Sequence, residues 1–154
     1  MVNVDMTIMK NKKILLVDDE LDILNLLETV LKKEGFNNIY KTTSGHETIK
    51  MCEKIAPDLI VLDIMLPDID GFEVCRRLRE FCLVPIIFLS AKDDDVDKLL
   101  GLGIGGDDYI TKPFSPKEVA FRIKAHFRRS EYFNLKSLSD SKRIIRFGDV
   151  EIDE

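Results

Sequence analysis

The sequence contains no tryptophan, only three cysteines and only two histidines among its 154 residues. The cysteines lack the paired spacing of a zinc site, so we interpret Cys52, Cys75 and Cys82 as buried or half-buried thiols in a reducing compartment. His46 and His126 lie far apart without a matching Cys or Ser partner, and we assign them no catalytic role. No apolar run approaches the roughly 20 residues of a membrane span, and no secretory signal is evident. These absences favour a cytoplasmic protein that does not enter the membrane.

The overall composition is that of a globular protein, with 45% hydrophobic and 33% charged residues. The net charge of -5 gives no general attraction to nucleic acid. This average conceals an asymmetry, because the first two thirds of the chain are acidic and the end is basic. One core and a short appendage fit this length.

Five short apolar runs alternate with segments of helical periodicity, and short turns connect them. This alternation predicts a doubly wound α/β fold, a parallel sheet flanked by five helices, with the strand order 2-1-3-4-5. The expected strands are 13–17, 39–43, 59–62, 85–89 and 107–111. The predicted helix at 93–104 contains Gly101 and Gly103, each of which costs about 0.5–1 kcal/mol relative to alanine. We therefore expect the fastest hydrogen exchange in this helix.

Reactive side chains follow the predicted strands at the edge where ligands bind in such sheets. Asp18 and Asp19 follow the first strand, Asp63 the third, Ser90 the fourth and Lys112 the fifth. Asp63 taken alone has a helix N-cap as its alternative, less favoured interpretation. Converging carboxylates repel unless a cation joins them, and oxygen ligands favour Mg²⁺ or Mn²⁺. Together with an ammonium and a hydroxyl, they indicate a phosphoryl-transfer site.

These strand ends carry sequence motifs of a known family. The motifs are Ile14-Leu15-Leu16-Val17-Asp18-Asp19-Glu20, Asp63-Ile64-Met65-Leu66-Pro67 with Asp70-Gly71, Ser90-Ala91-Lys92, and Asp107-Asp108-Tyr109-Ile110-Thr111-Lys112-Pro113-Phe114. Over about residues 12–130 the chain resembles the receiver domain of two-component response regulators of the OmpR/PhoB type, which has the flavodoxin-like receiver fold.

The resemblance implies a role for each motif residue. Asp63 would accept a phosphoryl group from a histidine kinase. Mg²⁺ would be bound by Asp19, Asp63 and the main-chain carbonyl of Met65, with Asp18 acting through water. The phosphoryl-contacting and switch group would comprise Ser90, Ala91, Lys112 and Tyr109, and the Lys112-Pro113 peptide would be cis.

The resemblance also implies that phosphorylation pairs two copies through the fourth helix, fifth strand and fifth helix. The matching charged positions are Lys98 with Glu118, and Asp107 or Asp108 with Arg122. Phe121 departs from the small residue usual at its position, and Gly101 and Gly103 loosen the helix that should form the face. These departures leave the dimer mode open.

The two ends of the chain differ from its centre. We expect a flexible leader over 1–11, the receiver domain over 12–130, and a Ser- and Asn-containing linker over 131–142. Residues 143–154, with Phe147-Gly148-Asp149-Val150, resemble the first strands of a winged-helix DNA-binding domain that is cut short. Promoter DNA would then be bound only through that missing domain.

Two other readings compete with the phosphorylation switch. A Mg²⁺-dependent phosphatase of the haloacid-dehalogenase kind also uses a strand-end aspartate, but it needs a second Asp where this chain has Met65. A degenerate receiver that serves only as an interaction module would have lost the acidic pair or the lysine. This chain retains both features, so we expect a signalling domain rather than an enzyme acting on other substrates.

Overall fold

The computed structural model describes residues 9–91 and 95–147, and the side chains of 9–91 and 96–131. A five-stranded sheet forms the centre, in the order β2-β1-β3-β4-β5, and every neighbouring pair is parallel. The strands are β1 (Lys13–Val17), β2 (Asn38–Thr42), β3 (Leu59–Leu62), β4 (Ile86–Ser90) and β5 (Asp108–Thr111). The predicted flavodoxin-like receiver fold and strand order are confirmed.

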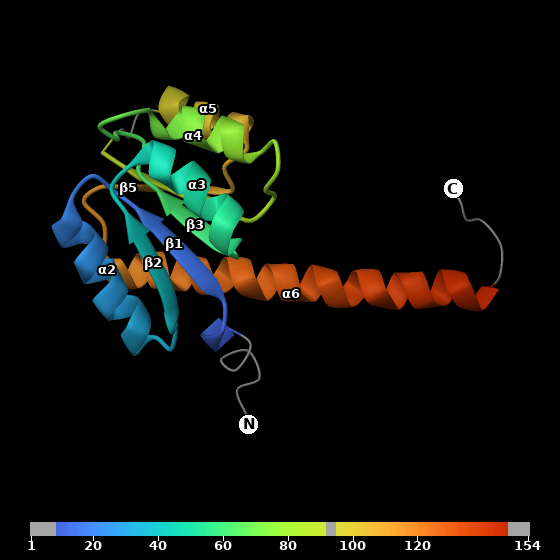
Figure 1. Ribbon diagram of the computed structural model, residues 1–154. Helices are drawn as coiled ribbons and strands as arrows, with labels where there is room; N and C mark the ends of the chain where they lie inside the picture. Colours follow the sequence, from blue (N-terminus) through green and yellow to red (C-terminus); the bar gives the residue numbers. More distant parts are fainter. Residues whose placement is uncertain (1–8, 92–94, 148–154) are drawn as a thin grey trace.

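The helices cover both faces of this sheet (Figure 1). They are α2 (Leu21–Lys33), α3 (Gly45–Ile55), α4 (Gly71–Leu78), α5 (Asp95–Ile104) and α6 (Pro116–Phe147). Helices α2 and α6 lie on one face, and α3, α4 and α5 lie on the other. No helix in the part of the chain that the structure describes is long and apolar enough to cross a membrane.

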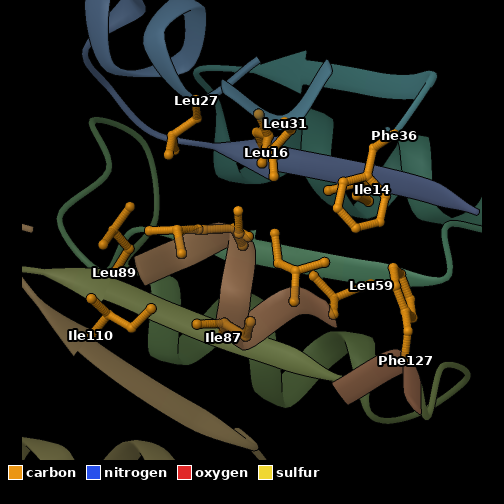
Figure 2. Packing of buried hydrophobic residues seen from close by; sticks show 14 of the residues in the cluster. Ile14, Leu16, Leu27, Leu31, Phe36, Leu59, Ile87, Leu89, Ile110 and Phe127 are labelled. Atoms are coloured by element: carbon orange, nitrogen blue, oxygen red, sulfur yellow. The ribbon is translucent and has the colours of Figure 1, made fainter. Parts of the chain in front are cut away.

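The core beneath α2 and α6 is built from alternate strand residues (Figure 2). Leu16 of β1, Leu31 of α2 and Phe127 of α6 are at most 2% exposed, and Phe36 packs at 6.0 Å from the Phe127 ring. Because side chains alternate across a strand, Leu15 and its equivalents point to the other helices instead. Both sheet faces are therefore apolar, which explains the continuous apolar runs of the central strands.

On the opposite face, one glycine of α5 and one in the loop after it pack closely on the sheet. A Cβ atom at Gly101 would lie 3.0 Å from the rings of Phe72 and Phe88, and one at Gly106 would lie 2.4 Å from Phe88. The Phe88 ring also contacts Phe72 edge to face at 5.3 Å. Gly101 thus provides packing as well as weakening the helix, whereas Gly103 faces open space.

Arg79, at the end of α4, binds the residues that follow the C-terminus of α5. Its guanidinium donates hydrogen bonds to the Gly105 carbonyl at 2.7 and 2.9 Å and to the Val84 carbonyl at 2.8 Å, and it pairs with Asp107 at 3.0 Å. Asp107 in turn accepts a hydrogen bond from the Ile86 amide at 2.9 Å. The loop between α5 and β5 is therefore tied to α4 and to the start of β4.

The structure differs from our expectation at the end of the chain. Residues 131–147, expected to form a linker and then a strand, continue α6 as one helix of 32 residues. This stretch has no proline or glycine, and its Ser and Asn residues cost at most about 0.7 kcal/mol each in a helix. Extending an existing helix also avoids the cost of nucleation. Residues 148–154 lie outside the described chain, and the division into domains stays a prediction.

Two residues of the expected leader, 9 and 10, are ordered on the core instead of flexible. Residues 9 and 10 are helical, and Met9 is buried in the core beneath α2 and α6. Residues 1–8 lie outside the described residues.

Candidate functional site

The carboxyl ends of β1, β3 and β5 bring three charged side chains into contact. Asp18 follows β1 and Asp63 follows β3, and both are almost completely buried. The Lys112 ammonium, from the end of β5, lies 2.9 Å from Asp18 Oδ2 and donates a hydrogen bond to Asp63 Oδ2 at 3.2 Å. Three segments far apart in sequence therefore converge on a single point, as expected for the ends of parallel strands.

Asp63 does not begin a helix. Its Oδ1 accepts a hydrogen bond from the Met65 amide at 3.1 Å, whereas Asp70 caps α4 by accepting from the Phe72 amide at 2.6 Å. The alternative interpretation of Asp63 as a helix N-cap is therefore wrong. The Asp63 carboxylate instead contacts Lys112 and lies close to Asp18.

Burial dominates the electrostatics of the two carboxyl groups. Burial and the neighbouring Asp18 raise the pKa of Asp63 to about 6, against the opposing effect of Lys112. Burial also raises the pKa of Asp18, more than the Glu20 amide and Lys112 lower it. Burial lowers the pKa of Lys112, but the two carboxylates outweigh it and raise that pKa overall. The site thus holds more negative charge than one ammonium stabilises.

The donor set fits a hard divalent cation. Asp18, Asp19 and Glu20 each offer a carboxylate oxygen, and these atoms lie within 4.8 Å of one another. Asp18 Oδ2 is buried and receives no hydrogen bond from the described residues, although Lys112 lies at ion-pair distance. Such oxygen donors suit Mg²⁺. The position of Glu20 in this cluster was visible in its motif, but sequence reasoning assigned it no role.

Ser90 and Lys112 are joined through the backbone. Ser90 is fully buried at the end of β4, pairs in register with Thr111, and accepts a hydrogen bond from the Lys112 amide through its carbonyl at 2.8 Å. Ala91, which follows it, is exposed. The Lys112-Pro113 peptide is cis, the geometry that the resemblance implies.

Tyr109 lies on β5, ahead of Lys112 in the sequence. It is half-buried, and its ring lies 6.0 Å from the ring of Phe88. The Phe88 ring also packs against Gly101 of α5 and against Gly106. Tyr109 is therefore connected to α5 through its contact with Phe88.

An open hollow of about 400 Å³ lies beside the acidic residues. Asp19 and Asp70 line it together with the loop residues Met65 and Pro67. Met65 is 57% exposed, so a small molecule can approach the site across this loop.

Four of the five charged residues of the expected dimer face, Asp107, Asp108, Glu118 and Arg122, pair within the chain. Arg122 contacts Asp108 at 2.6 Å and Glu118 at 3.3 Å, and Asp107 pairs with Arg79. Lys98 lies on α5, and Phe121 is 63% exposed on α6. Pairing between copies stays a prediction.

The buried His126 has a partner that sequence reasoning does not predict. Its Nε2 lies 3.1 Å from Asp108 Oδ2, on the side of Asp108 opposite to the Arg122 contact with Oδ1. Burial raises the pKa of Asp108, but the hydrogen bonds from His126 and the Tyr109 amide, together with the charge of Arg122, outweigh it and lower that pKa. Helical spacing placed His126 on the inner face, although nothing in the spacing indicated its partner.

The parallel fold and the acidic strand-end site together define a signalling domain of the phosphoacceptor type. Comparison with known proteins gives the same result: the model of the response regulator receiver domain family matches residues 14–124. The chain belongs to this family.

Similar proteins support this assignment. The chain is 54% identical over 122 residues to the alkaline phosphatase synthesis transcriptional regulatory protein PhoP of Bacillus subtilis, covering 79% of this chain and 50% of that protein. It therefore spans about half the length of this curated relative. The beryllofluoride-activated receiver domain of Klebsiella pneumoniae RstA superposes with a TM-score of 0.72 at 33% identity, covering 76% of this chain and 99% of that one. DrrB, a Thermotoga maritima OmpR/PhoB homologue, gives 0.70 at 34% identity, covering 77% of this chain and 54% of that one.

Proposed function

We propose that this receiver domain is switched by phosphorylation of Asp63, with a histidine kinase as the donor and Mg²⁺ as the required cation. The observation that carries the proposal is the contact of Lys112 with Asp63 and Asp18 across three strand ends. A carboxylate nucleophile beside an ammonium and a cation-binding acidic group is the arrangement that phosphoryl transfer needs.

In the proposed reaction, an ionised Asp63 oxygen attacks the phosphorus of the donor. The P–N bond of the phosphohistidine breaks, and the imidazole leaves with its bonding electron pair and takes up a proton. Lys112 moves from its pairing with the carboxylates to the phosphoryl oxygens, and the Ser90 hydroxyl donates to the same group. Asp19, Asp63 and the Met65 carbonyl would hold Mg²⁺ directly and Asp18 through water. When bound, this ion neutralises charge that develops on the phosphoryl oxygens.

The phosphoryl group then changes the surface formed by α5, β5 and α6. Ser90 moves towards the phosphate, and Tyr109 turns inwards to fill the space that it leaves. The packing of Tyr109 on Phe88, and of Phe88 on Gly101, supports transmission of this change to α5. A charge-driven rearrangement of this kind is how such switches operate.

We propose that the altered surface pairs two copies of the chain. Lys98 would then contact Glu118 of the other copy, and Arg122 would exchange its own Asp108 for that of the other copy. Exposed ion pairs contribute at most about 1 kcal/mol each, so this exchange favours a reversible dimer. In the full-length protein we propose a cytoplasmic transcription regulator that binds promoter DNA through an effector domain. The relative from B. subtilis, of which the matched region covers 50%, is named as a transcriptional regulatory protein.

Phosphorylation can be tested with acetyl phosphate and Mg²⁺. Intact-mass measurement should show one added phosphoryl group on the parent chain and none on Asp63→Asn. Asp22→Asn is a matched control, because Asp22 is an exposed aspartate in the first turn of α2 and should leave labelling unchanged. Equal labelling of Asp63→Asn and the parent would overturn the assignment.

Dimerisation can be tested by sedimentation with and without beryllofluoride and Mg²⁺. The parent should shift from monomer to dimer. Glu118→Arg should remain monomeric, whereas Glu47→Arg, a charge reversal on α3 away from the face, should dimerise like the parent. Dimerisation of Glu118→Arg at the parental concentration would exclude the proposed face.

A further inference from the structure

Asp68 connects the loop after Asp63 to the beginning of another helix. This exposed carboxylate accepts three hydrogen bonds from the start of α3: from the Ser44 hydroxyl at 2.8 Å, the Gly45 amide at 2.8 Å and the His46 amide at 2.9 Å. The Ser44 hydroxyl oxygen also accepts from the Glu47 amide at 3.1 Å. Asp68 therefore satisfies amides that the helix itself leaves without partners.

Packing independently brings the same two segments together. A Cβ atom at Gly45 would lie 2.7 Å from Ile69 Cγ1 and 2.9 Å from Val74 Cγ2. Only glycine therefore allows α3 to approach the loop this closely. The hydrogen bonds of Asp68 and the contact of Ile69 with Gly45 hold adjacent loop residues against one helix end.

The other side of the loop is fixed at Asp63. The Gly71 amide donates to the Ile64 carbonyl at 2.7 Å, and a Cβ atom at Gly71 would lie 2.3 Å from the Asp63 carbonyl oxygen. The Met65 amide donates to the Asp63 carboxylate. Met65 thus lies between two fixed points of the loop. One is the contact of Gly71 with Asp63 and Ile64, and the other is the set of hydrogen bonds that Asp68 accepts from α3.

The charge of Asp68 is suited to a permanent attachment. Burial alone would raise the pKa of Asp68, but the His46 and Gly45 amides and the Ser44 hydroxyl lower it well below its usual range. A carboxylate is also favoured at a helix N-terminus by the helix dipole. Asp68 therefore stays ionised at neutral pH.

We propose that Asp68 is a positioning residue that fastens the 64–70 loop to α3 and so holds the Met65 main-chain carbonyl ready for the divalent cation. This inference rests on the proposed function, in which that carbonyl binds Mg²⁺. A preorganised ligand loses less conformational entropy when the cation binds. Loss of Asp68 should therefore weaken cation affinity, although Asp68 does not touch the ion.

The test compares Asp68→Ala and Asp68→Asn with the parent and with Glu47→Gln. Glu47→Gln is the matched control, because it removes one negative charge from the same helix end without removing a hydrogen bond of the loop. Mg²⁺ dissociation constants are measured by amide chemical-shift titration of the folded proteins. Hydrogen exchange of residues 64–70 is measured in EDTA, and stability is measured by urea unfolding.

We expect Asp68→Ala to bind Mg²⁺ about tenfold more weakly and to exchange its 64–70 amides faster in the metal-free state. Asp68→Asn should lie between the parent and Asp68→Ala, because its remaining side-chain oxygen still accepts a hydrogen bond. The Mg²⁺ concentration for half-maximal labelling should rise, while the labelling rate at saturating Mg²⁺ should stay within about twofold of the parent.

A residue that served stability alone would lower the urea midpoint without changing Mg²⁺ affinity in the folded state. Parental Mg²⁺ affinity in both Asp68→Ala and Asp68→Asn would overturn the inference, and if Asp68→Ala does not fold, Asp68→Asn decides it. Failure of the parent itself to bind Mg²⁺ or to be labelled would instead overturn the proposed function.

Discussion

The Lys112 ammonium lies 2.9 Å from Asp18 Oδ2, and both residues are largely shielded from water. The same ammonium reaches Asp63, so a single cation stabilises two buried carboxylates. Removing one member of a buried charge group leaves the others without compensation.

Substitution of Lys112 should therefore destabilise the metal-free protein. We expect Lys112→Met to lower the free energy of unfolding by about 2–4 kcal/mol at pH 8 in EDTA. The loss should be smaller at pH 5, where protonation relieves the repulsion between Asp18 and Asp63. Urea unfolding measures both values. Lys50→Met is the control for losing an exposed lysine, and a Lys112→Met midpoint equal to that of the control at pH 8 would contradict the prediction.

The raised pKa of Asp63 predicts a pH-dependent effect of its own replacement. The folded pKa of about 6 exceeds the ordinary value of 3.8, so ionisation costs more in the folded chain than in the unfolded chain. This contribution favours folding below pH 3.8 and is lost as the pH rises through 6. In EDTA, Asp63→Asn should be more stable than the parent by about 1–2 kcal/mol at pH 8, since the loss of the Lys112 contact offsets part of the gain.

The gain from Asp63→Asn should decrease between pH 6 and pH 4, as followed by thermal unfolding. Added Mg²⁺ should stabilise the parent and leave Asp63→Asn almost unchanged, because only binding to the folded state raises stability. An advantage of Asp63→Asn that is constant from pH 4 to pH 8 would show that ionisation is not its cause.

The two glycines of α5 should respond oppositely to alanine. Gly103→Ala adds a methyl group where no atom lies within 4 Å, and it should stabilise the protein by about 0.5–1 kcal/mol. Gly101→Ala presses on the rings of Phe72 and Phe88, and it should destabilise by about 1–3 kcal/mol. The stabilities of the two variants are compared by their urea midpoints. Hydrogen exchange in α5, which we expect to be the fastest among the five helices, is compared in the same two variants. Equal effects would mean that the Phe88 contact does not control the position of α5.

Arg79 should be far more important than its neighbour Arg76 on the same helix. Arg79 is largely buried and bonds to carbonyls of two loops, whereas Arg76 makes an exposed pair with Glu73. We expect Arg79→Ala to cost about 2–4 kcal/mol and Arg76→Ala at most about 1 kcal/mol. Exchange of the amides at 105–107 should accelerate only in Arg79→Ala, which a general loss of stability would not produce.

The sequence predicts the sheet well because buried parallel strands are continuously apolar and their carboxyl ends share an edge. From that rule alone, Asp18, Asp63 and Lys112 were expected to meet, and they do. The attachments made by Asp68 and Arg79 were not foreseen, because each depends on one side chain reaching another segment and leaves no periodic pattern. The sequence does not predict the continuation of α6, because Ser and Asn are typical of linkers, although they only weaken a helix.

The long α6 extends beyond the sheet as one continuous helix. Glu131 still touches the body through Lys12 at 3.4 Å, whereas the 16 residues after it extend the helix by about 24 Å (Figure 1). A tilt of about 10° at its base would swing the tip by about 4 Å at the helical rise per residue. Any partner attached there would experience an ångström-scale displacement from a rearrangement too small to alter the sheet.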